Sequence, residues 1–442
     1  MQFARLMVSC AAAAAVASPV SAQLPSTPRA LGMGGAYVAV ARGQEALFTN
    51  PANLALPGNP HTSAAAPQIT LGATLNGLTF GDANDLRDFD ELSAEQRNDI
   101  LGRIPDEGTS ADIDLRIPVF SMSVRRAMFG VAYNITGRHG VSRDVADLVL
   151  NGVNVQRLVP GNTNPYDAQD ILDRSQGYRA AYWDFAGGYA HRVGPVSLGF
   201  VGHYLRGGRL VRSGAIAVDT VLSVTAPDVR VTYAGVRREG ASGFGLDLGA
   251  AFRPNPSLTL SAAVANVVNT LEWKGEREIY NVVLSRENYR TGDPEQIRNQ
   301  YAESGRPLEG ADARLLARAQ GLIADLDVGA ELAPTLRAGA AWEPRAGTTV
   351  AASYQGELSD SRLSGPWNRS LSIGWQQKVP VVTLRAGAAT DLESGALLGG
   401  GLSLGPLHLG AARVTGSAEG NSSQRGWLFT FGLGGRTNST MN

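Results

Sequence analysis

Apolar and polar residues alternate along most of the chain. Between Phe244 and Phe252 every second residue is apolar, and the intervening positions hold glycine, aspartate or alanine. Residues 129–136 and 257–264 repeat this alternation. Because successive side chains of a β-strand point to opposite faces, each segment predicts a strand with one apolar face and one polar or glycine-rich face. The pattern therefore predicts an all-β protein.

About 16 segments show this alternation, a number within the range of antiparallel transmembrane β-barrels. A single alternating strand could also belong to a soluble sandwich, so the number of strands and their spacing carry the prediction. Two segments, 214–225 and 229–238, are either wall strands or a hairpin that stands above the rim. The wall then has about 16 strands in the first case and about 14 in the second. The segments begin near residues 69, 115, 128, 182, 195, 214, 229, 243, 257, 335, 347, 368, 381, 396, 407 and 426.

The connections between these segments are short and long in turn. If the first strand runs outward from the periplasm, all the short connections lie on the periplasmic side, which is the asymmetry of outer-membrane barrels. The short connections are 193–195, 254–257, 343–347, 378–380 and 404–406. The long connections are 81–112, 138–181, 269–334, 358–367 and 417–425, and we expect them to be extracellular.

Two long loops contain helical patterns. Residues 92–104 predict a short helix, because Ser93 stands at a cap position with Gln96 three residues later, and apolar residues up to Ile104 share one face. Residues 312–326 show a second pattern of this kind. We expect both helices to pack on the mouth of the barrel, and the alternative is a dedicated partner site. The acidic residues of the first loop suit a solvated face better than a cation site.

Composition removes several classes of protein. The formal net charge is -1, with 39 Lys plus Arg against 40 Asp plus Glu, so the chain lacks the basic surface of a nucleic-acid binder. Only 18% of residues are charged, against about a quarter in an ordinary soluble domain. No segment after the N-terminus is apolar for the length of a transmembrane helix, which leaves the closed barrel as the membrane-spanning structure.

The first 22 residues predict a cleaved signal peptide. Arg5 supplies the positive charge, residues 6–17 are apolar, and Val20-Ser21-Ala22 is a small-x-small cleavage site. The apolar run is shorter than the roughly 20 residues of a membrane-spanning helix, which is the competing interpretation. A lipid anchor on Cys10 is a further alternative. Cys10 is the only cysteine, so the mature chain has no disulfide or thiolate chemistry.

The mature N-terminus carries a distinctive motif. Residues 29–41 read RALGMGGAYVAVA, and residues 45–54 read EALFTNPANL. This stretch resembles the N-terminus of the FadL-like outer-membrane family, which contains fatty-acid transporters, channels for hydrophobic compounds, and PorV-like and TraF-like relatives. The resemblance implies a plug, or hatch, over residues 23–66 inside a fourteen-stranded barrel formed by residues 67–435. The plug residues that match the motif are Gly32, Gly34, Gly35, Asn50, Pro51 and Ala52.

The C-terminus carries a second mark of an outer-membrane barrel. Residues 424–431 read QRGWLFTF, which is similar to the assembly signal that such barrels present to the barrel-assembly machinery. The positions that match are Gln424, Gly426, Phe429 and Phe431. Trp427 suits an interfacial aromatic belt facing outer-membrane lipids. Residues 436–442 follow as a periplasmic tail, although many such proteins end on the aromatic residue itself.

Catalytic and metal chemistry has little support in the sequence. Residues 401–405 read GLSLG and fit the string of a nucleophile elbow, but an elbow needs a strand, a turn and a helix, and Pro406 follows here. The histidines lack metalloprotease spacing. We therefore predict no catalytic, cofactor or metal residues. Asp184, Asp247 and Arg385 are expected to face the lumen, where they tune permeation or pair with the plug.

These features predict a channel or transporter in the outer membrane of a Gram-negative bacterium. It would pass small hydrophobic molecules through a plugged barrel, and it would not be an enzyme. The alternative is a PorV-like or TraF-like scaffold that holds a protein partner of a secretion or conjugation system at its outer loops. An apolar path past the plug would favour transport, and a sealed lumen would favour the scaffold.

Overall fold

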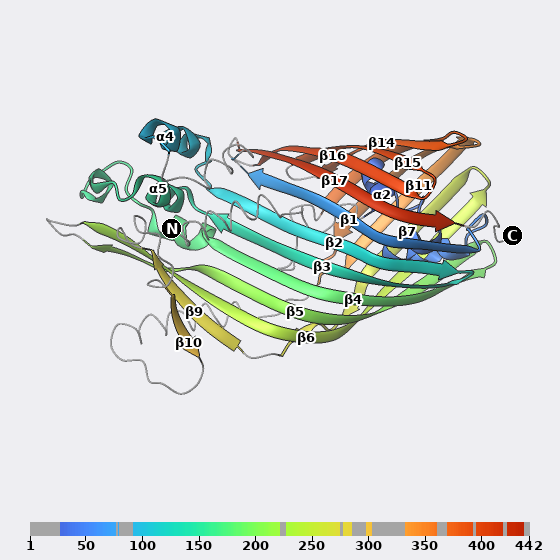
Figure 1. The fold of residues 1–442 in the computed structure, drawn as a ribbon, viewed down its shortest axis with the longest axis horizontal. Coiled ribbons are helices and arrows are strands. Elements are labelled where there is room, and N and C mark those ends of the chain that lie inside the picture. Colours follow the sequence, from blue (N-terminus) through green and yellow to red (C-terminus); the bar gives the residue numbers. More distant parts are fainter. Residues whose placement is uncertain are drawn as a thin grey trace.

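The computed structural model is a closed antiparallel β-barrel (Figure 1). The structure describes residues 27–76, 78, 92–221, 227–274, 277–284, 298–302, 332–359, 369–391, 395–418 and 422–436. Fourteen strands form the wall, each paired with its neighbours in chain order, and the pairs β1–β17 and β7–β11 complete the ring. The all-β prediction and the smaller of the two strand numbers are therefore confirmed.

The wall strands are β1 (Thr62–Asn76), β2 (Thr109–Val124), β3 (Ala127–Val141), β4 (Gln176–Val193), β5 (Val196–Val221), β6 (Asp228–Asn255), β7 (Leu258–Asn269), β11 (Thr335–Arg345), β12 (Thr348–Glu357), β13 (Arg369–Lys378), β14 (Val382–Asp391), β15 (Gly395–Leu404), β16 (Leu407–Ala418) and β17 (Ser422–Arg436).

The two segments of uncertain role, 214–225 and 229–238, extend wall strands instead of adding new ones. β5 has 26 residues and β6 has 28, so the two strands run on past the wall as a paired ribbon, which ends at the pair Val221–Asp228. The outer part of β6 also pairs with β8 (Glu272–Trp273) and β9 (Arg277–Leu284), and β9 pairs with β10 (Arg298–Ala302). The hairpin above the rim is the correct interpretation.

Short turns join the strands at one end of the barrel, which we call the turn end; the opposite end is the loop end. Each predicted short connection separates two wall strands. Gly194, Gly347 and Gly405 have positive φ values of 59°, 83° and 55°, which a tight turn between antiparallel strands often requires. A further turn that the sequence analysis did not identify lies between β2 and β3, where Arg125 has a φ of 54°.

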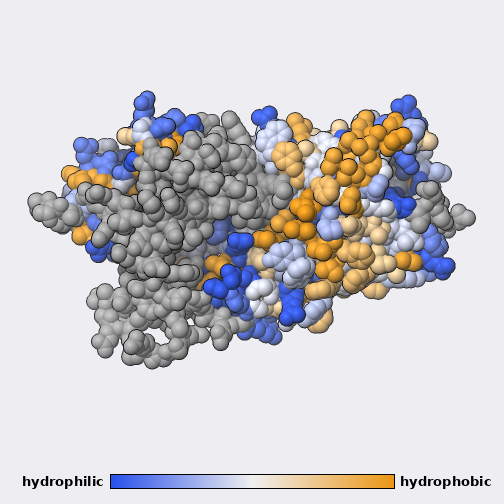
Figure 2. All heavy atoms as spheres, in the orientation of Figure 1, coloured by the Kyte–Doolittle hydropathy of each residue, from blue (hydrophilic) through white to orange (hydrophobic). Residues whose placement is uncertain are grey.

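The outer face of the wall is apolar. Along β17, Trp427, Phe429, Phe431 and Leu433 are between 42% and 57% exposed, while Leu428 between them is 1% exposed. Figure 2 shows hydrophobic residues gathered over the barrel wall, with hydrophilic residues at the turn end. The alternation seen in the sequence thus separates an outer apolar surface from the lumen. Among the described residues, no helix is both long and apolar enough to cross a membrane.

Short helices cover the loop end. α4 (Ala94–Arg103) has the predicted capping box, in which Ser93 accepts from the Gln96 backbone and the Gln96 side chain accepts from the Ser93 backbone. The connection 138–181 also contains α5 (Arg143–Asn151), η4 (Val155–Leu158) and α6 (Ala168–Arg174), which were not identified from the sequence. α5 and α6 bury Val145, Leu148 and Ile171 against the β5–β6 ribbon. The predicted helix at 312–326 lies outside the described residues.

Residues 27–61, which we call the N-terminal segment, lie inside the barrel in the half nearest the turn end (Figure 1). The segment contains α2 (Pro28–Gly32) and two 3-10 helices, η1 (Gly43–Phe48) and η2 (Pro51–Ala55). α2 contacts β14 to β17, and η2 contacts β4 to β7, so the segment bridges opposite sides of the wall. Every residue of the three helices is buried.

Candidate functional site

The glycines of the N-terminal motif lie where its backbone touches the wall. A Cβ atom added to Gly32 would lie 2.9 Å from the Cα atom of Gly401 on β15, and one added to Gly34 would lie 2.5 Å from the backbone nitrogen of Ala388 on β14. Gly34 and Gly35 also have positive φ values of 62° and 92°. Side chains at these positions would force the segment off the wall, so glycine is required for this close approach.

Asn50 attaches the opposite side of the segment to the wall. Its Nδ2 atom donates to Ser261 Oγ at 2.6 Å and to the Ala262 carbonyl oxygen at 2.9 Å, both on β7. Its Oδ1 atom accepts from the Ala52 backbone at 3.0 Å, which caps η2 with Pro51 at the first helical position. Asn50 and Ala52 are both 0% exposed. The structure therefore brings Asn50, Pro51 and Ala52 together against β5, β6 and β7.

Ser261 joins two parts of the N-terminal segment to this anchor. Its hydroxyl donates to Asn53 Oδ1 at 2.8 Å, and Asn53 Nδ2 donates to the Val38 carbonyl oxygen at 2.7 Å. Arg337 on β11 adds a bond to the Phe48 carbonyl oxygen at 3.0 Å. Buried polar groups need partners of this kind, because an unpaired group keeps its full desolvation cost.

Glu45 is the centre of a buried ion cluster that was not predicted from the sequence. Its Oε2 atom lies 3.1 Å from Arg29 Nη1, accepts from the Tyr37 hydroxyl at 2.7 Å, and is also bonded to Arg436 at the end of β17. Burial of the carboxylate opposes its ionisation, but Arg29, Arg436 and the Tyr37 hydrogen bond outweigh this and lower the pKa of Glu45 to about 2. Glu45 is therefore ionised at neutral pH.

A chain of hydrogen bonds runs from this cluster into the wall. Arg29 Nη2 lies 2.7 Å from His408 Nε2, and His408 Nδ1 lies 2.8 Å from Ser403 Oγ. Because a guanidinium can only donate, His408 Nε2 must accept, and the ring is neutral with its proton on Nδ1. Ser403 Oγ then accepts from both His408 and Arg385, the latter at 2.6 Å.

This arrangement disagrees with a catalytic role for Ser403. It lies in β15, within a strand and not at a strand-to-helix turn. A serine nucleophile needs a histidine that can take up its proton and is oriented by a carboxylate at the other nitrogen. Here the second nitrogen of His408 faces Arg29, whose positive charge opposes protonation of the ring. The Ser403–His408 pair therefore lacks the electrostatics of a catalytic dyad.

Asp184 and Asp247 form a second buried cluster on the inner wall. Asp184 lies 2.7 Å from Arg116 and 2.8 Å from His203, and Asp247 lies 3.3 Å from the other nitrogen of His203. The Arg116 guanidinium also lies 4.3 Å from the ring centroid of Phe48 in the N-terminal segment. The lumen-facing positions of both aspartates are confirmed, and their direct ionic partners belong to the wall.

An apolar patch lies on the same inner face, farther toward the loop end. Tyr182 follows the lumen-facing periodicity of Asp184 along β4, and it packs with Leu205, Leu271 and Trp273. Trp273 is 7% exposed, and its Nε1 atom has no hydrogen-bond partner among the residues that the structure describes. All four side chains are at most 9% exposed, so they pack mainly against one another and form an apolar cluster on the inner wall.

A polar cavity of about 680 Å³ opens at the turn end, which we call the turn-end cavity. Its walls come from the N-terminal segment and from β11 to β17. Five cationic residues line it: Arg29, Arg42, Lys378, Arg385 and Arg436. Glu343 is the one acidic residue among the residues that line it.

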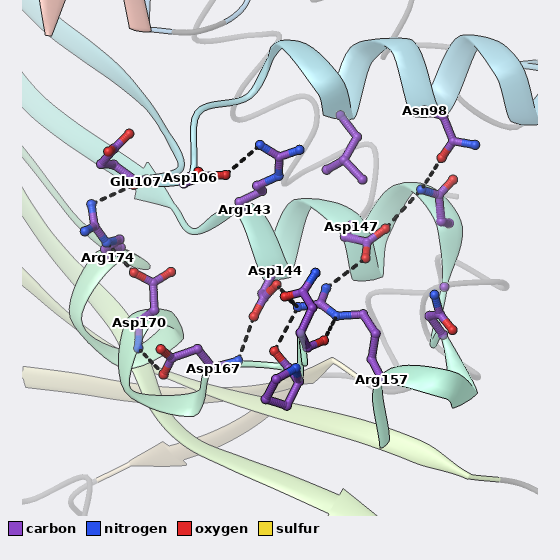
Figure 3. Close-up of a pocket in the computed structure, with 16 residues that line it drawn as sticks. Asn98, Asp106, Glu107, Arg143, Asp144, Asp147, Arg157, Asp167, Asp170 and Arg174 are labelled. Atoms are coloured by element: carbon purple, nitrogen blue, oxygen red, sulfur yellow. Dashed lines mark hydrogen bonds and ion pairs between the residues drawn. The ribbon is translucent and has the colours of Figure 1, made fainter. Parts of the chain in front are cut away.

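A second polar pocket, of about 960 Å³, lies between the helices of the loop end and is called the loop-end pocket (Figure 3). Arg157 spans its floor, with ion pairs to Asp144 at 2.6 Å and to Asp147 at 3.1 Å, and its guanidinium lies 4.0 Å from the Tyr166 ring centroid. Arg143 pairs with Asp106 at 2.9 Å across the pocket. The arginines of this pocket therefore have carboxylate partners of their own.

The residues of the C-terminal motif lie on β17. Phe429 and Phe431 point outward, 57% and 43% exposed, and Gly426 follows the inward periodicity. The backbone of Gln424 pairs with Asn76 on β1 and with Gly416 on β16, at the ring-closing strand. Over the ranges that the structure describes, no three His, Cys, Asp or Glu side chains gather where they could hold a metal ion.

Comparison with known proteins identifies similar folds only. No protein-family model and no curated protein matches the sequence. The fold is similar to that of the toluene transporter TodX of Pseudomonas putida, with a TM-score of 0.50 over 94% of this chain and 99% of that chain, at 12% identity. The toluene transporter TbuX of Ralstonia pickettii gives a TM-score of 0.48 over 93% of this chain and 98% of that chain, also at 12% identity. The fourteen-stranded barrel implied by the N-terminal resemblance is thus found in the structure.

Proposed function

We propose that this protein is a FadL-like channel of the bacterial outer membrane that passes small hydrophobic molecules. The observation that carries the proposal is the closed, outwardly apolar barrel with residues 27–61 folded inside it. The likeness of its fold to the toluene transporter TodX supports the choice of cargo class. Signal removal after residue 22, contact with outer-membrane lipids, assembly through Gln424, Gly426, Phe429 and Phe431, and a periplasmic tail at 436–442 belong to the same proposal.

In this proposal the N-terminal segment is a plug that blocks the turn half of the lumen. Gly32, Gly34 and Gly35 let it lie on β14 and β15, while Asn50, Pro51 and Ala52 hold it to β5, β6 and β7. The apolar cluster of Tyr182, Leu205, Leu271 and Trp273 lies on the inner wall between the loop end and the plug. Passage then requires the plug to loosen at one of its two attachments.

The Asn50 anchor gives a direct test. Asn50→Ala removes the bonds to Ser261 and Ala262, so we expect a larger conductance in planar bilayers and faster uptake of labelled toluene into liposomes. Asn151→Ala is the matched control, since the Asn151 side chain is bonded to Asn98 and Asp147 at the loop end. If neither the parent protein nor the Asn50 variant takes up toluene, and a protein partner co-purifies from the native membrane, the channel proposal is wrong and the scaffold takes its place.

A further inference from the structure

The turn-end cavity has a charge that a route for neutral hydrocarbons does not need. Arg29 and Arg436 share the single carboxylate of Glu45, and the remaining cations are Arg42, Lys378 and Arg385. Burial and the nearby charge of Arg253 lower the pKa of Arg42 to about 10, which still leaves it protonated at neutral pH. Glu343, the acidic residue in the lining, lies 3.7 Å from Arg253. The cavity therefore carries an excess of positive charge.

Arg385 shows this excess most clearly. The residue is 7% exposed, yet within the described part of the chain its guanidinium donates to two neutral oxygens, Gln376 Oε1 at 2.8 Å and Ser403 Oγ at 2.6 Å. These bonds use Nε and Nη1, so Nη2 is not engaged in either of them. Among the described residues, no carboxylate lies within ion-pair distance of Arg385. A buried charge without a counterion is costly, and it is normally found where a ligand or partner supplies the opposite charge.

The wall around Arg385 also offers further donors. Ser403 Oγ accepts from Arg385 and His408, which leaves its own hydroxyl hydrogen for another acceptor. Lys378 is exposed on the cavity rim. Donors thus converge on the cavity from β13, β14 and β15.

We propose that the turn-end cavity binds a small organic or inorganic anion that carries a carboxylate or a phosphate. Arg385 is the primary ligand, with Ser403 and Lys378 as further donors. A guanidinium matches the two oxygens of either group, and a cavity of about 680 Å³ has the size of a small-molecule site. The site is independent of the proposed transport of neutral compounds, and it would exist in a channel and in a scaffold alike.

The test is isothermal titration calorimetry on the purified full-length protein in detergent, with benzoate, inorganic phosphate and neutral benzyl alcohol as probes. We expect saturable binding of at least one anion, and at least tenfold weaker binding by Arg385→Gln. Lys378→Gln is a second variant at an exposed position, with an expected loss of a few fold. Arg345→Gln is the matched control: Arg345 is exposed at the same end of the barrel, outside the lining, and is bonded to Thr348.

The outcomes separate the two sources of the anion. Binding of benzoate alone identifies an amphiphile with a carboxylate, binding of phosphate alone identifies a phosphate group, and binding of both supports the shared chemistry. The proposal is wrong if neither anion binds, if benzyl alcohol binds as tightly as benzoate, or if the Arg385 and Lys378 variants bind like the parent. If Arg385→Gln does not fold, as shown by loss of heat-modifiable gel mobility, anion binding by Lys378→Gln tests the proposal instead. Toluene uptake by the same proteins tests the channel separately.

Discussion

The loop-end pocket and the turn-end cavity are both polar, but they treat charge in opposite ways. At the loop end, Arg157 lies between Asp144 and Asp147, and all three side chains are 12% to 13% exposed. At the turn end, Arg385 is 7% exposed, and its two hydrogen-bond acceptors among the described residues are the neutral oxygens of Gln376 and Ser403. In the loop-end pocket the paired charges hold the helices together. In the turn-end cavity the excess positive charge favours binding of an anion. Polarity alone therefore does not identify a binding site.

The largest effect is expected at Glu45, a buried carboxylate that balances the charge of two arginines at the turn end. Glu45→Gln leaves Arg29 and Arg436 without their carboxylate, and breaking such a buried pair costs roughly 3–5 kcal/mol. We expect the N-terminal segment to become sensitive to protease while the barrel keeps its heat-modifiable gel mobility. Glu343→Gln is the control, because the Glu343 side chain is 43% exposed. Equal protease resistance in both variants would show that the ion cluster does not hold the segment.

Arg157→Ala is expected to have the next largest effect, confined to the loop end. Its two ion pairs retain some contact with water, so we expect a loss of roughly 2–4 kcal/mol in the local stability of α5 and α6. Hydrogen exchange of amides in residues 143–174 measures this loss. Arg143→Ala is the matched control, since its partner Asp106 is 94% exposed. If exchange also speeds up in residues 27–61, the two regions are coupled and the comparison fails.

Acidic pH should weaken the attachment of the N-terminal segment at the turn end, because Glu45 becomes protonated. Glu45 has a folded pKa of about 2 against a reference of 4.5, so its stabilising effect is complete above pH 4.5 and is lost as the pH falls toward 2. At pH 3 roughly 2 kcal/mol of attachment should be gone. Protease sensitivity of the N-terminal segment against pH measures this, with Glu45→Gln as the variant that should show no such dependence. A flat profile for the parent protein would contradict the ion-cluster interpretation.

The smallest effect is expected at Ser93, where the loop end depends on local capping instead of buried charge. Ser93→Ala removes the acceptor for the Gln96 backbone and should cost about 1 kcal/mol of α4 stability. Ser93→Asn keeps a capping side chain and should restore most of it. Hydrogen exchange of α4 measures both variants. No loss in either variant would mean that packing of Ile100, and not the cap, holds the helix.

The sequence predicted the barrel well because its signal is local. Period-two alternation and the glycine and proline turns are visible within ten residues, and so is the Ser93 cap. The β5–β6 ribbon could not be separated from two wall strands, because a strand keeps the same period above the rim as within the wall. α5 and α6 had readable caps at Ser142 and Asp167, but each helix is short and lies in a loop rich in turn residues.

The charge chemistry was much less predictable. Glu45 meets Tyr37 from 8 residues away, Arg29 from 16 and Arg436 from 391, and Arg385 meets Ser403 from 18. No single spacing rule connects these positions. The fold of the N-terminal segment brings Tyr37 and Arg29 to Glu45, the pairing of β14 with β15 brings Arg385 to Ser403, and ring closure by β17 brings Arg436. The motif identified Asn50, Pro51 and Ala52, but it contained nothing about Ser261 and Ala262, which receive the Asn50 side chain.

The bond between Glu45 and Arg436 joins the first folded segment of the chain to the last residue of the last wall strand. Arg436 stands opposite Ser63 in the pairing of β17 with β1, so this contact depends on the pair of strands that closes the ring. The carboxylate near the start of the chain is thus fully neutralised only in a completed ring. One ion pair in the interior of the barrel therefore depends on closure of the wall around it.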